Sequence, residues 1–268
     1  MSELEFKEYL QSKKLSDSSI MQYLAYFRLF EKQILKRGLD QEVVTKFIIK
    51  HNSNVTRAFL KSFFDFYNIN ELKIVKPSGR KPKKKKKSMS PQEMKLIRNY
   101  LYSKNWRWGL MLDLSYHCAL RREEVLNIRP ENFDLLKWKE DISLPCRLKI
   151  EGKGSKERLV VVPPALMKIV VKYMKELNEL YEGEKLFKAG KTLWHNAFKE
   201  AVKNKLDYNY TLHDLRRSKA TYWHEQGLDL FKIKTRLGHS SISTTQLYIN
   251  PDEEKELENW EKEYKRED

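Results

Sequence analysis

A run of basic residues with two prolines divides this sequence into two parts. Residues 76 to 87 read KPSGRKPKKKKK, with eight lysines and arginines, two prolines, one glycine and no acidic residue. Like charges at this density repel one another, and the run has no apolar side chain to bury, so it cannot be an element of a packed domain. We therefore expect a linker over residues 76–88, between one domain at residues 1–75 and another at residues 89–268.

The charge of the whole chain indicates a polyanionic partner. The 268 residues include 53 Lys and Arg against 37 Asp and Glu, a net charge of +16, of which half lies in the basic run. This balance is typical of proteins that bind nucleic acid. Fully extended, the run would span about 40 Å at roughly 3.3 Å per residue, which is enough to follow a DNA groove. A solvated linker without contacts is the alternative.

Composition excludes several other classes of protein. A hydrophobic content of 40% is too high for a disordered chain, and no apolar run reaches the roughly 18 residues of a membrane span. Cys118 and Cys146 form no Cys-x-x-Cys pair, which excludes a disulfide scaffold and a zinc site built from cysteines. The N-terminus is acidic and does not resemble a signal peptide. We expect a cytoplasmic protein without a membrane partner.

The residue pattern predicts a mainly α-helical protein with one small antiparallel β-sheet (α+β). Before the basic run, helical spacing is found in segments 3–13, 16–37, 40–48 and 54–67, where the aromatic residues are expected to form a core. After it, a capping box at residues 90–93 begins a helix, and the helical pattern continues through 106–126. Residues 147–163 read as a β-hairpin, followed by helices at 165–178, 191–203, 212–226 and 229–236.

Two motifs in the first half of the second domain offer charged side chains. Arg121 and Glu124 are three residues apart on the expected helix, so the carboxylate can orient the guanidinium. Lys153 lies between two glycines at the expected hairpin tip, where the backbone can turn tightly and expose it. Taken alone, these motifs are a surface ion pair and a solvated turn.

Two further motifs follow near the C-terminal end. His213 and Arg216 share one helix face, so that their donors point the same way. His239, in a Leu-Gly-His turn, precedes Tyr248 by nine residues. Taken alone, these residues are a capping histidine, a surface arginine and an ordinary helical tyrosine.

Together and in this order, the motifs resemble the tyrosine recombinases, the family of phage integrases and Xer proteins. The family pattern is an arginine, a lysine, His-x-x-Arg, a Leu-Gly-His turn and a tyrosine nine residues later. It is matched by Arg121, Lys153, His213, Arg216, His239 and Tyr248. The resemblance covers essentially the whole second domain and, more weakly, the first. Ala119 departs from the pattern, because the family usually has glycine there, and we expect the change to be tolerated.

The resemblance implies a fold and a reaction. Residues 1–75 would be a helical core-binding (SAM-like) DNA-binding domain, and residues 89–268 a recombinase catalytic domain. The reaction would be site-specific cleavage and rejoining of DNA for integration, excision or multimer resolution, through a 3′-phosphotyrosine on Tyr248 and a Holliday junction. Lys153 suits the general acid for the leaving 5′-hydroxyl. No metal or cofactor is expected, because arginines and histidines supply the positive charge at the phosphate.

Other residues are expected to bind DNA or a second copy of the chain. The expected DNA contacts are the basic side chains of the linker and the hairpin: Arg80, Lys81, Lys83, Lys84, Lys85, Lys86, Lys87, Lys156 and Arg158. The partner would be a double-stranded recombination site bound by a tetramer. In the acidic C-terminal segment, Leu257, Trp260 and Tyr264 share one helix face that could dock on a neighbouring protomer or pack on its own domain.

Two other functions are compatible with these residues. A type IB topoisomerase-like enzyme would share the chemistry but would nick and relax DNA as a monomer. A non-catalytic DNA-binding protein could keep the fold alone. The expected self-association argues against the first, and the intact set of six residues argues against the second. We expect no additional arm-binding domain, which favours the Xer kind, although compact integrases also exist.

Overall fold

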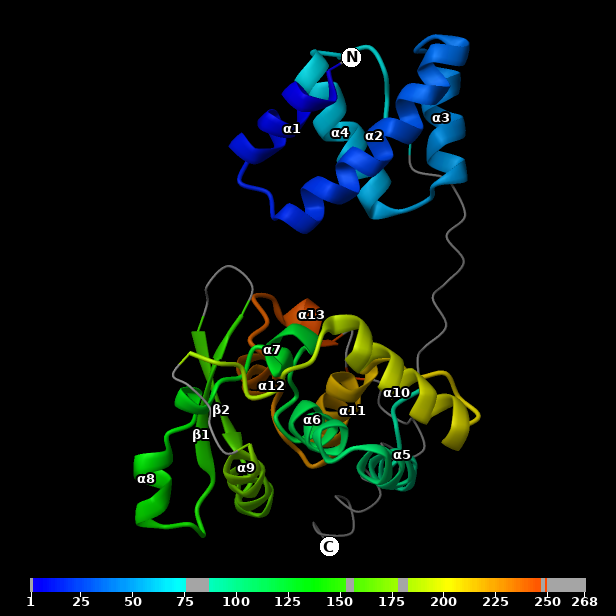
Figure 1. The fold of residues 1–268 in the computed structure, drawn as a ribbon. Coiled ribbons are helices and arrows are strands. Elements are labelled where there is room, and N and C mark those ends of the chain that lie inside the picture. Colours follow the sequence, from blue (N-terminus) through cyan, green and yellow to red (C-terminus); the bar gives the residue numbers. More distant parts are fainter. Residues whose placement is uncertain (1, 76–86, 153–156, 178–182, 247–248, 250–268) are drawn as a thin grey trace, which may run out of the picture. The chain divides into compact units, whose positions relative to one another are not determined.

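The chain divides into two compact units, Met1–Lys84 and Lys85–Asp268. The computed structural model describes residues 2–75, 87–152, 157–177, 183–246 and 249 (Figure 1). The described residues are mainly helical with a single two-stranded antiparallel sheet, which confirms the fold class predicted from the sequence. The point of division falls inside the basic run of residues 76–87.

The N-terminal unit is formed by four helices around an aromatic core. They are α1 (Glu3–Ser12), α2 (Asp17–Arg37), α3 (Gln41–Lys50) and α4 (Asn54–Tyr67). The side chains of Ser16, Asp40 and Ser53 begin the last three, each accepting a hydrogen bond from the backbone N–H three residues ahead. The predicted aromatic stripe is buried as core, including Phe6, Phe27, Phe30, Phe47, Phe59 and Phe63.

The C-terminal unit begins with a helix that has the predicted capping box. Ser90 accepts from the backbone N–H of Glu93, and the Glu93 carboxylate accepts from that of Ser90. The described elements are α5 (Pro91–Lys104), α6 (Trp106–His117), α7 (Arg122–Leu126), the 3₁₀ helix η1 (Pro130–Asn132), α8 (Leu135–Glu140), β1 (Cys146–Glu151), β2 (Glu157–Val162), α9 (Pro164–Glu176), α10 (Lys191–Lys205), α11 (Leu212–Glu225), α12 (Leu230–Leu237) and α13 (Ile242–Gln246).

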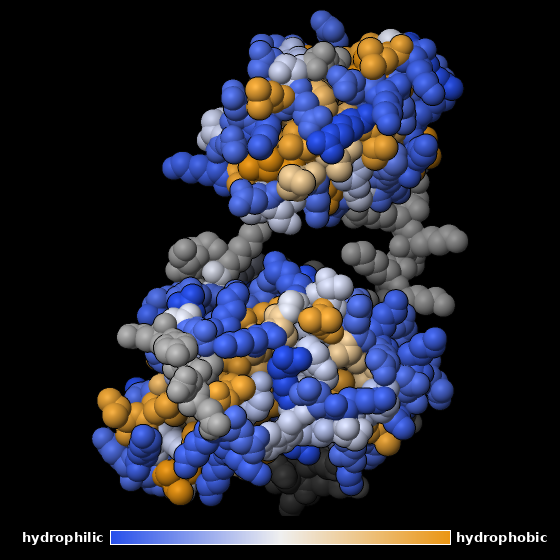
Figure 2. All heavy atoms as spheres, viewed as in Figure 1, coloured by the Kyte–Doolittle hydropathy of each residue, from blue (hydrophilic) through white to orange (hydrophobic). Residues whose placement is uncertain are grey.

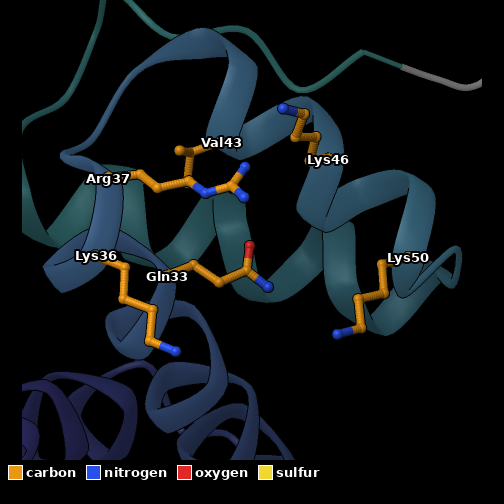
Figure 3. Close-up of a pocket in the computed structure, with 6 residues that line it drawn as sticks. All are labelled: Gln33, Lys36, Arg37, Val43, Lys46 and Lys50. Carbon is orange, nitrogen blue, oxygen red and sulfur yellow. The ribbon is translucent and has the colours of Figure 1, made fainter.

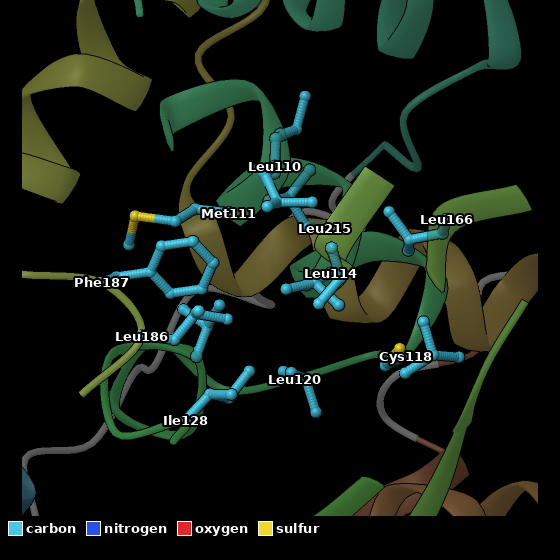
Figure 4. Close-up of a cluster of buried hydrophobic side chains, with 14 of the residues drawn as sticks. Leu110, Met111, Leu114, Cys118, Leu120, Ile128, Leu166, Leu186, Phe187 and Leu215 are labelled. Atoms are coloured by element: carbon cyan, nitrogen blue, oxygen red, sulfur yellow. The ribbon is translucent and has the colours of Figure 1, made fainter. Parts of the chain in front are cut away.

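Helix α6 lies inside this unit and packs against α5, α9, α10 and α11. Its buried residues join those of the segment that follows, of α9 and α11, and of the loop before α10 (Figure 4). The hairpin packs beside them, with Cys146 paired to Val162 at one end and Glu151 to Glu157 at the other. This core fixes where α6 ends, and therefore where the segment containing Arg121 begins.

The prediction of a helix through residues 106–126 is wrong in its middle. Helix α6 ends at His117 and α7 begins at Arg122. Between them, Ala119 has φ +50°, in the left-handed region that cannot continue a right-handed helix. Arg121, two residues later, has extended backbone and directly precedes α7. The short helices η1 and α8 also form where the sequence predicted no element.

Hydrophilic side chains cover much of the visible surface of each unit (Figure 2). In the C-terminal unit, apolar side chains gather over α8 and the sheet. The exposed ones are Leu136, Ile142, Leu144, Leu159 and Val161. Within the described ranges, no helix has the length and apolarity that crossing a membrane requires.

Candidate active site

The carboxylate of Glu124 is the centre of a cluster of arginines. It lies in the first turn of α7, and its side chain is 3% exposed. Its Oε1 accepts from Arg121 Nη1 at 2.8 Å and from Arg158 Nη1 at 2.7 Å. Its Oε2 accepts from the backbone N–H of Arg121 at 2.7 Å and from Arg158 Nη2 at 2.8 Å. Arg216 Nη1 lies 3.7 Å from the same oxygen, so one carboxylate holds three guanidinium groups.

These contacts keep Glu124 ionised. Burial would raise the pKa of the Glu124 carboxyl. The hydrogen bonds from Arg158 and from the backbone N–H of Arg121, together with the charges of Arg158 and Arg216, instead lower this pKa to about 2. The carboxylate is therefore negative near pH 7, and it can offset part of the positive charge around it.

Arg216 is fully buried in α11 and is fixed by backbone carbonyls. Its Nη1 donates to the carbonyl oxygen of Ala119 at 2.6 Å, and its Nη2 donates to that of Leu237, at the end of α12. The guanidinium thus joins α11 to the segment before α7 and to the turn after α12. Figure 1 shows α7, α12 and α13 beside one end of the hairpin.

His239 follows the glycine that ends α12 in a left-handed conformation. Its side chain is buried, with Nδ1 3.0 Å from Thr245 Oγ1 in α13. Burial lowers the pKa of His239, and the charges of Arg216, Arg121, His213 and Arg158 lower it further, to about 4. The imidazole is therefore neutral near pH 7. His213, which contributes to this effect, is exposed in the first turn of α11.

Arg158 has a setting different from the one predicted. As a DNA contact of the hairpin it should be open to solvent, but its side chain is 11% exposed and both of its Nη atoms bind Glu124. The structure therefore assigns it to the arginine cluster. The alternation of β2 contains the missed signal, because Arg158 shares the inward face of the strand with Val160 and Val162. An arginine on an apolar face needs a buried acid as its partner.

Glycine at position 238 leaves space for this arginine. A Cβ atom built on Gly238 would lie 2.9 Å from Cδ of Arg158, and the residue has φ +63°. Both the backbone conformation and the contact favour glycine. The Leu-Gly-His turn therefore serves two purposes, because it presents His239 and makes room for Arg158.

The structure thus brings Arg121, Glu124, Arg216 and His239 together, with His213 on the helix that carries Arg216. Lys87 is exposed, with its Nζ 3.2 Å from Glu93 Oε1. The remaining predicted residues lie outside the described residues: Arg80, Lys81, Lys83, Lys84, Lys85, Lys86, Lys153, Lys156, Tyr248, Leu257, Trp260 and Tyr264. In the part of the chain that is described, no group of three or more His, Cys, Asp or Glu could hold a metal ion.

Comparison with known proteins identifies the family. Residues 87–255 match the Phage integrase family. The chain belongs to that family. It is 31% identical to tyrosine recombinase XerC of Rickettsia bellii, over 91% of this chain and 81% of the relative. It is 29% identical to tyrosine recombinase XerA of Pyrococcus horikoshii, over 91% and 87%. Membership of the phage integrase family makes the protein an enzyme of site-specific DNA recombination.

Solved structures of phage integrase relatives share the fold. The XerH recombinase bound to a palindromic difH substrate, in a post-cleavage complex, has a TM-score of 0.72 at 18% identity, covering 97% of this chain and 85% of that one. A lambda integrase tetramer bound to a Holliday junction has a TM-score of 0.69 at 14% identity, covering 92% and 75%.

We predict that Glu124 makes the stability of the C-terminal unit depend on pH. Because its pKa in the folded protein lies below the ordinary value, the stabilisation is complete above about pH 5 and is lost as the pH falls towards about 2. Wild type should lose up to about 3 kcal/mol more unfolding free energy over this window than Glu124→Gln. Urea unfolding followed by tryptophan fluorescence measures it, since all six tryptophans follow the basic run.

The matched control is Glu123→Gln. Glu123 is the neighbouring residue, is 44% exposed and pairs with Arg122 and Lys191 at the surface. Exposed pairs contribute little, so this variant should keep the wild-type pH dependence. Equal pH dependence in Glu124→Gln and wild type would contradict the prediction.

We predict that Ala119→Gly stabilises the protein. A Cβ in the left-handed region costs roughly 1–2 kcal/mol, which glycine would relieve. Glycine also gives the unfolded chain more conformational freedom, and this cancels about half of the stabilisation. The unfolding free energy should rise by about 0.5–1 kcal/mol. Ala197→Gly, inside α10, is the control and should lower it by about 1 kcal/mol. Similar losses in both variants would show that Ala119 is not strained.

Proposed function

We propose that this protein cleaves one strand of a DNA recombination site with Tyr248 and rejoins it to another strand through a 3′-phosphotyrosine. The observation that best supports the proposal is the sharing of the Glu124 carboxylate by Arg121, Arg158 and Arg216. Three cations around one anion leave a net positive site. A phosphodiester with negative charge growing on its non-bridging oxygens is a ligand of the right sign.

The cationic and hydrogen-bonding side chains differ in their exposure and would therefore act on the phosphate in different ways. The Arg121 side chain is 36% exposed and uses only one Nη atom on Glu124, so its other donors can bind a non-bridging oxygen. Arg216 is buried, and it would contribute its positive charge from within the protein. His213, exposed at the start of α11, and the neutral His239 can each donate a ring N–H.

The bond changes balance without an external cofactor. The phenolic oxygen of Tyr248 gives up its proton to solvent and attacks phosphorus, the bond from phosphorus to the 5′ oxygen breaks, and protonated Lys153 donates a proton to that oxygen. The phosphotyrosine is a diester like the starting bond, so a 5′-hydroxyl from another strand can reverse the reaction. The roles of these two residues rest on the family resemblance.

Known relatives support double-stranded DNA and further protomers as partners. The solved structures that share the fold include the DNA complex of XerH and the lambda integrase tetramer on a Holliday junction. We propose that this chain also acts as a multimer on two DNA sites. The C-terminal residues Leu257, Trp260 and Tyr264 would contact a neighbour. Similarity to XerA and XerC favours a recombinase of the Xer kind.

The N-terminal unit would bind DNA in part through a basic pocket between α2 and α3. Four cations, Lys36, Arg37, Lys46 and Lys50, border a cavity of about 280 Å³ (Figure 3). Residues 1–75 contain twelve basic and nine acidic residues. The four cations and Glu42, which pairs with Lys46, account for the whole excess, since the other residues balance at eight against eight. A phosphate of the DNA backbone would be attracted to these four cations.

We predict a covalent protein–DNA adduct that depends on Tyr248. A pool of nicked suicide duplexes with randomised sequence around the nick traps the adduct, because the short product cannot be religated. Wild type should form it in EDTA as well as in magnesium, and Tyr248→Phe should form none because its ring has no nucleophilic oxygen. Denaturing electrophoresis of labelled DNA measures it. An adduct in the variant would rule out Tyr248, and none in wild type would contradict the proposed reaction.

We predict that the α2–α3 pocket contributes to the salt dependence of DNA binding. Each lost phosphate contact removes about 0.9 from the slope of log affinity against log salt. Lys36→Gln with Lys50→Gln should therefore flatten the slope by up to about 1.8 on random-sequence duplex, measured by fluorescence anisotropy. Lys7→Gln with Lys13→Gln, on α1 and just after it, removes the same charge elsewhere in this unit. Equal slopes for the two double variants would contradict a role for the pocket.

A further inference from the structure

The residues that end the basic run are attached directly to α11. The carbonyl oxygen of Lys87 accepts from Arg217 Nη2 at 2.7 Å. The hydroxyl of Ser88 donates to Thr221 Oγ1 at 3.2 Å, and the backbone N–H of Met89 donates to Ser218 Oγ at 2.8 Å. Three consecutive residues are thus held by three residues of one helix. We call this set of contacts the linker anchor.

Helix α11 carries the anchor and two proposed catalytic residues on neighbouring faces. Arg217, Ser218 and Thr221 face the end of the basic run, whereas Arg216 binds the Ala119 and Leu237 carbonyl oxygens. Arg216 and Arg217 are consecutive and therefore about 100° apart around the helix axis. His213 and Arg216 lie on the same helix as the three anchor residues, so we expect a displacement of residues 87–89 to be passed along α11 to them.

Arg217, the arginine of the linker anchor, is buried with incomplete hydrogen bonding. Arg217 is 8% exposed, and its Nε atom has no hydrogen-bond partner among the described residues. Its other contact is weak, with Nη2 3.6 Å from Asp214 Oδ1. Its short hydrogen bond to the Lys87 carbonyl oxygen is therefore the contact that orients this guanidinium. In the sequence it is only the second arginine of the pair that follows His213.

We propose that Arg217 is a positioning residue, and that the linker anchor transmits the binding of DNA by the basic run to the catalytic helix α11. The inference rests on the proposed function. When phosphates hold the run, the anchor holds α11 so that His213 and Arg216 face the scissile phosphate. Without the anchor, DNA would still bind but the two residues would be less well placed.

The test separates cleavage from binding. The substrate is the suicide duplex selected by wild type from the randomised pool. Arg217→Gln should bind it with an affinity within about twofold of wild type, because the phosphate contacts remain. The rate of adduct formation at saturating protein should fall roughly 10- to 100-fold, as expected for misplaced catalytic groups. Ser218→Ala removes one anchor contact and should lower the rate in the same direction with a smaller effect.

A double-mutant cycle distinguishes transmission from a merely structural role. Changing Lys83, Lys84, Lys85 and Lys86 to serine should lower the saturating cleavage rate in the wild-type background. In the Arg217→Gln background it should have no further effect on this rate, because the connection is already broken. Lys139→Gln, an exposed lysine of α8, is the charge control and should cleave like wild type. Tryptophan fluorescence checks that each variant is folded.

The outcomes are distinct. Effects of Arg217→Gln and of the linker variant that multiply would overturn the anchor as the route of transmission. A loss of affinity with an unchanged saturating rate would overturn the positioning role. No adduct with wild-type protein on any duplex of the pool would overturn the proposed function and this inference with it. Adduct formation by wild type with multiplying effects would leave the function and remove only the inference.

Discussion

The site depends on one desolvated carboxylate. Removing Glu124 from water is unfavourable, and it is compensated only because four hydrogen bonds and three guanidinium groups converge on its two oxygens. These partners come from the start of α7, from β2 and from α11. Glu124 therefore fixes the positions of three segments that are far apart in the sequence, and Arg216 extends the connection to the end of α12.

The same arrangement leaves more positive charge than the carboxylate can neutralise. The pKa of His239 reflects this positive charge. Burial lowers this pKa, and the charges of Arg216, Arg121, His213 and Arg158 lower it further, to about 4. A positive electrostatic potential that disfavours protonation of a histidine favours the binding of an anion at the same site. The same excess positive charge would attract a phosphate, and it would stabilise the further negative charge of a phosphoryl-transfer transition state.

Local signals in the sequence predicted much of the fold. The capping box at residues 90–93 predicted the start of α5, and the predicted segments 16–37 and 40–48 begin at Ser16 and Asp40, the caps of α2 and α3, because a cap depends on residues only three positions apart. Long-range contacts were not predictable in this way. Arg158 and Glu124 are 34 residues apart, so nothing near Arg158 indicates its partner. The break at Ala119 was also missed, because alanine favours a helix and only the surrounding core and the bond to Arg216 select the left-handed conformation.

The motifs of the site therefore encode backbone geometry as well as chemistry. Ala119 has φ +50° and directs its carbonyl to Arg216, and Gly238 has φ +63° and leaves space for Arg158. Both positions lie beside an arginine that contacts Glu124. A larger side chain at either position would disturb an arginine of the cluster. The small residues next to the proposed catalytic ones are constrained, because the arginines can converge on one carboxylate only if the backbone beside them adopts the left-handed conformation.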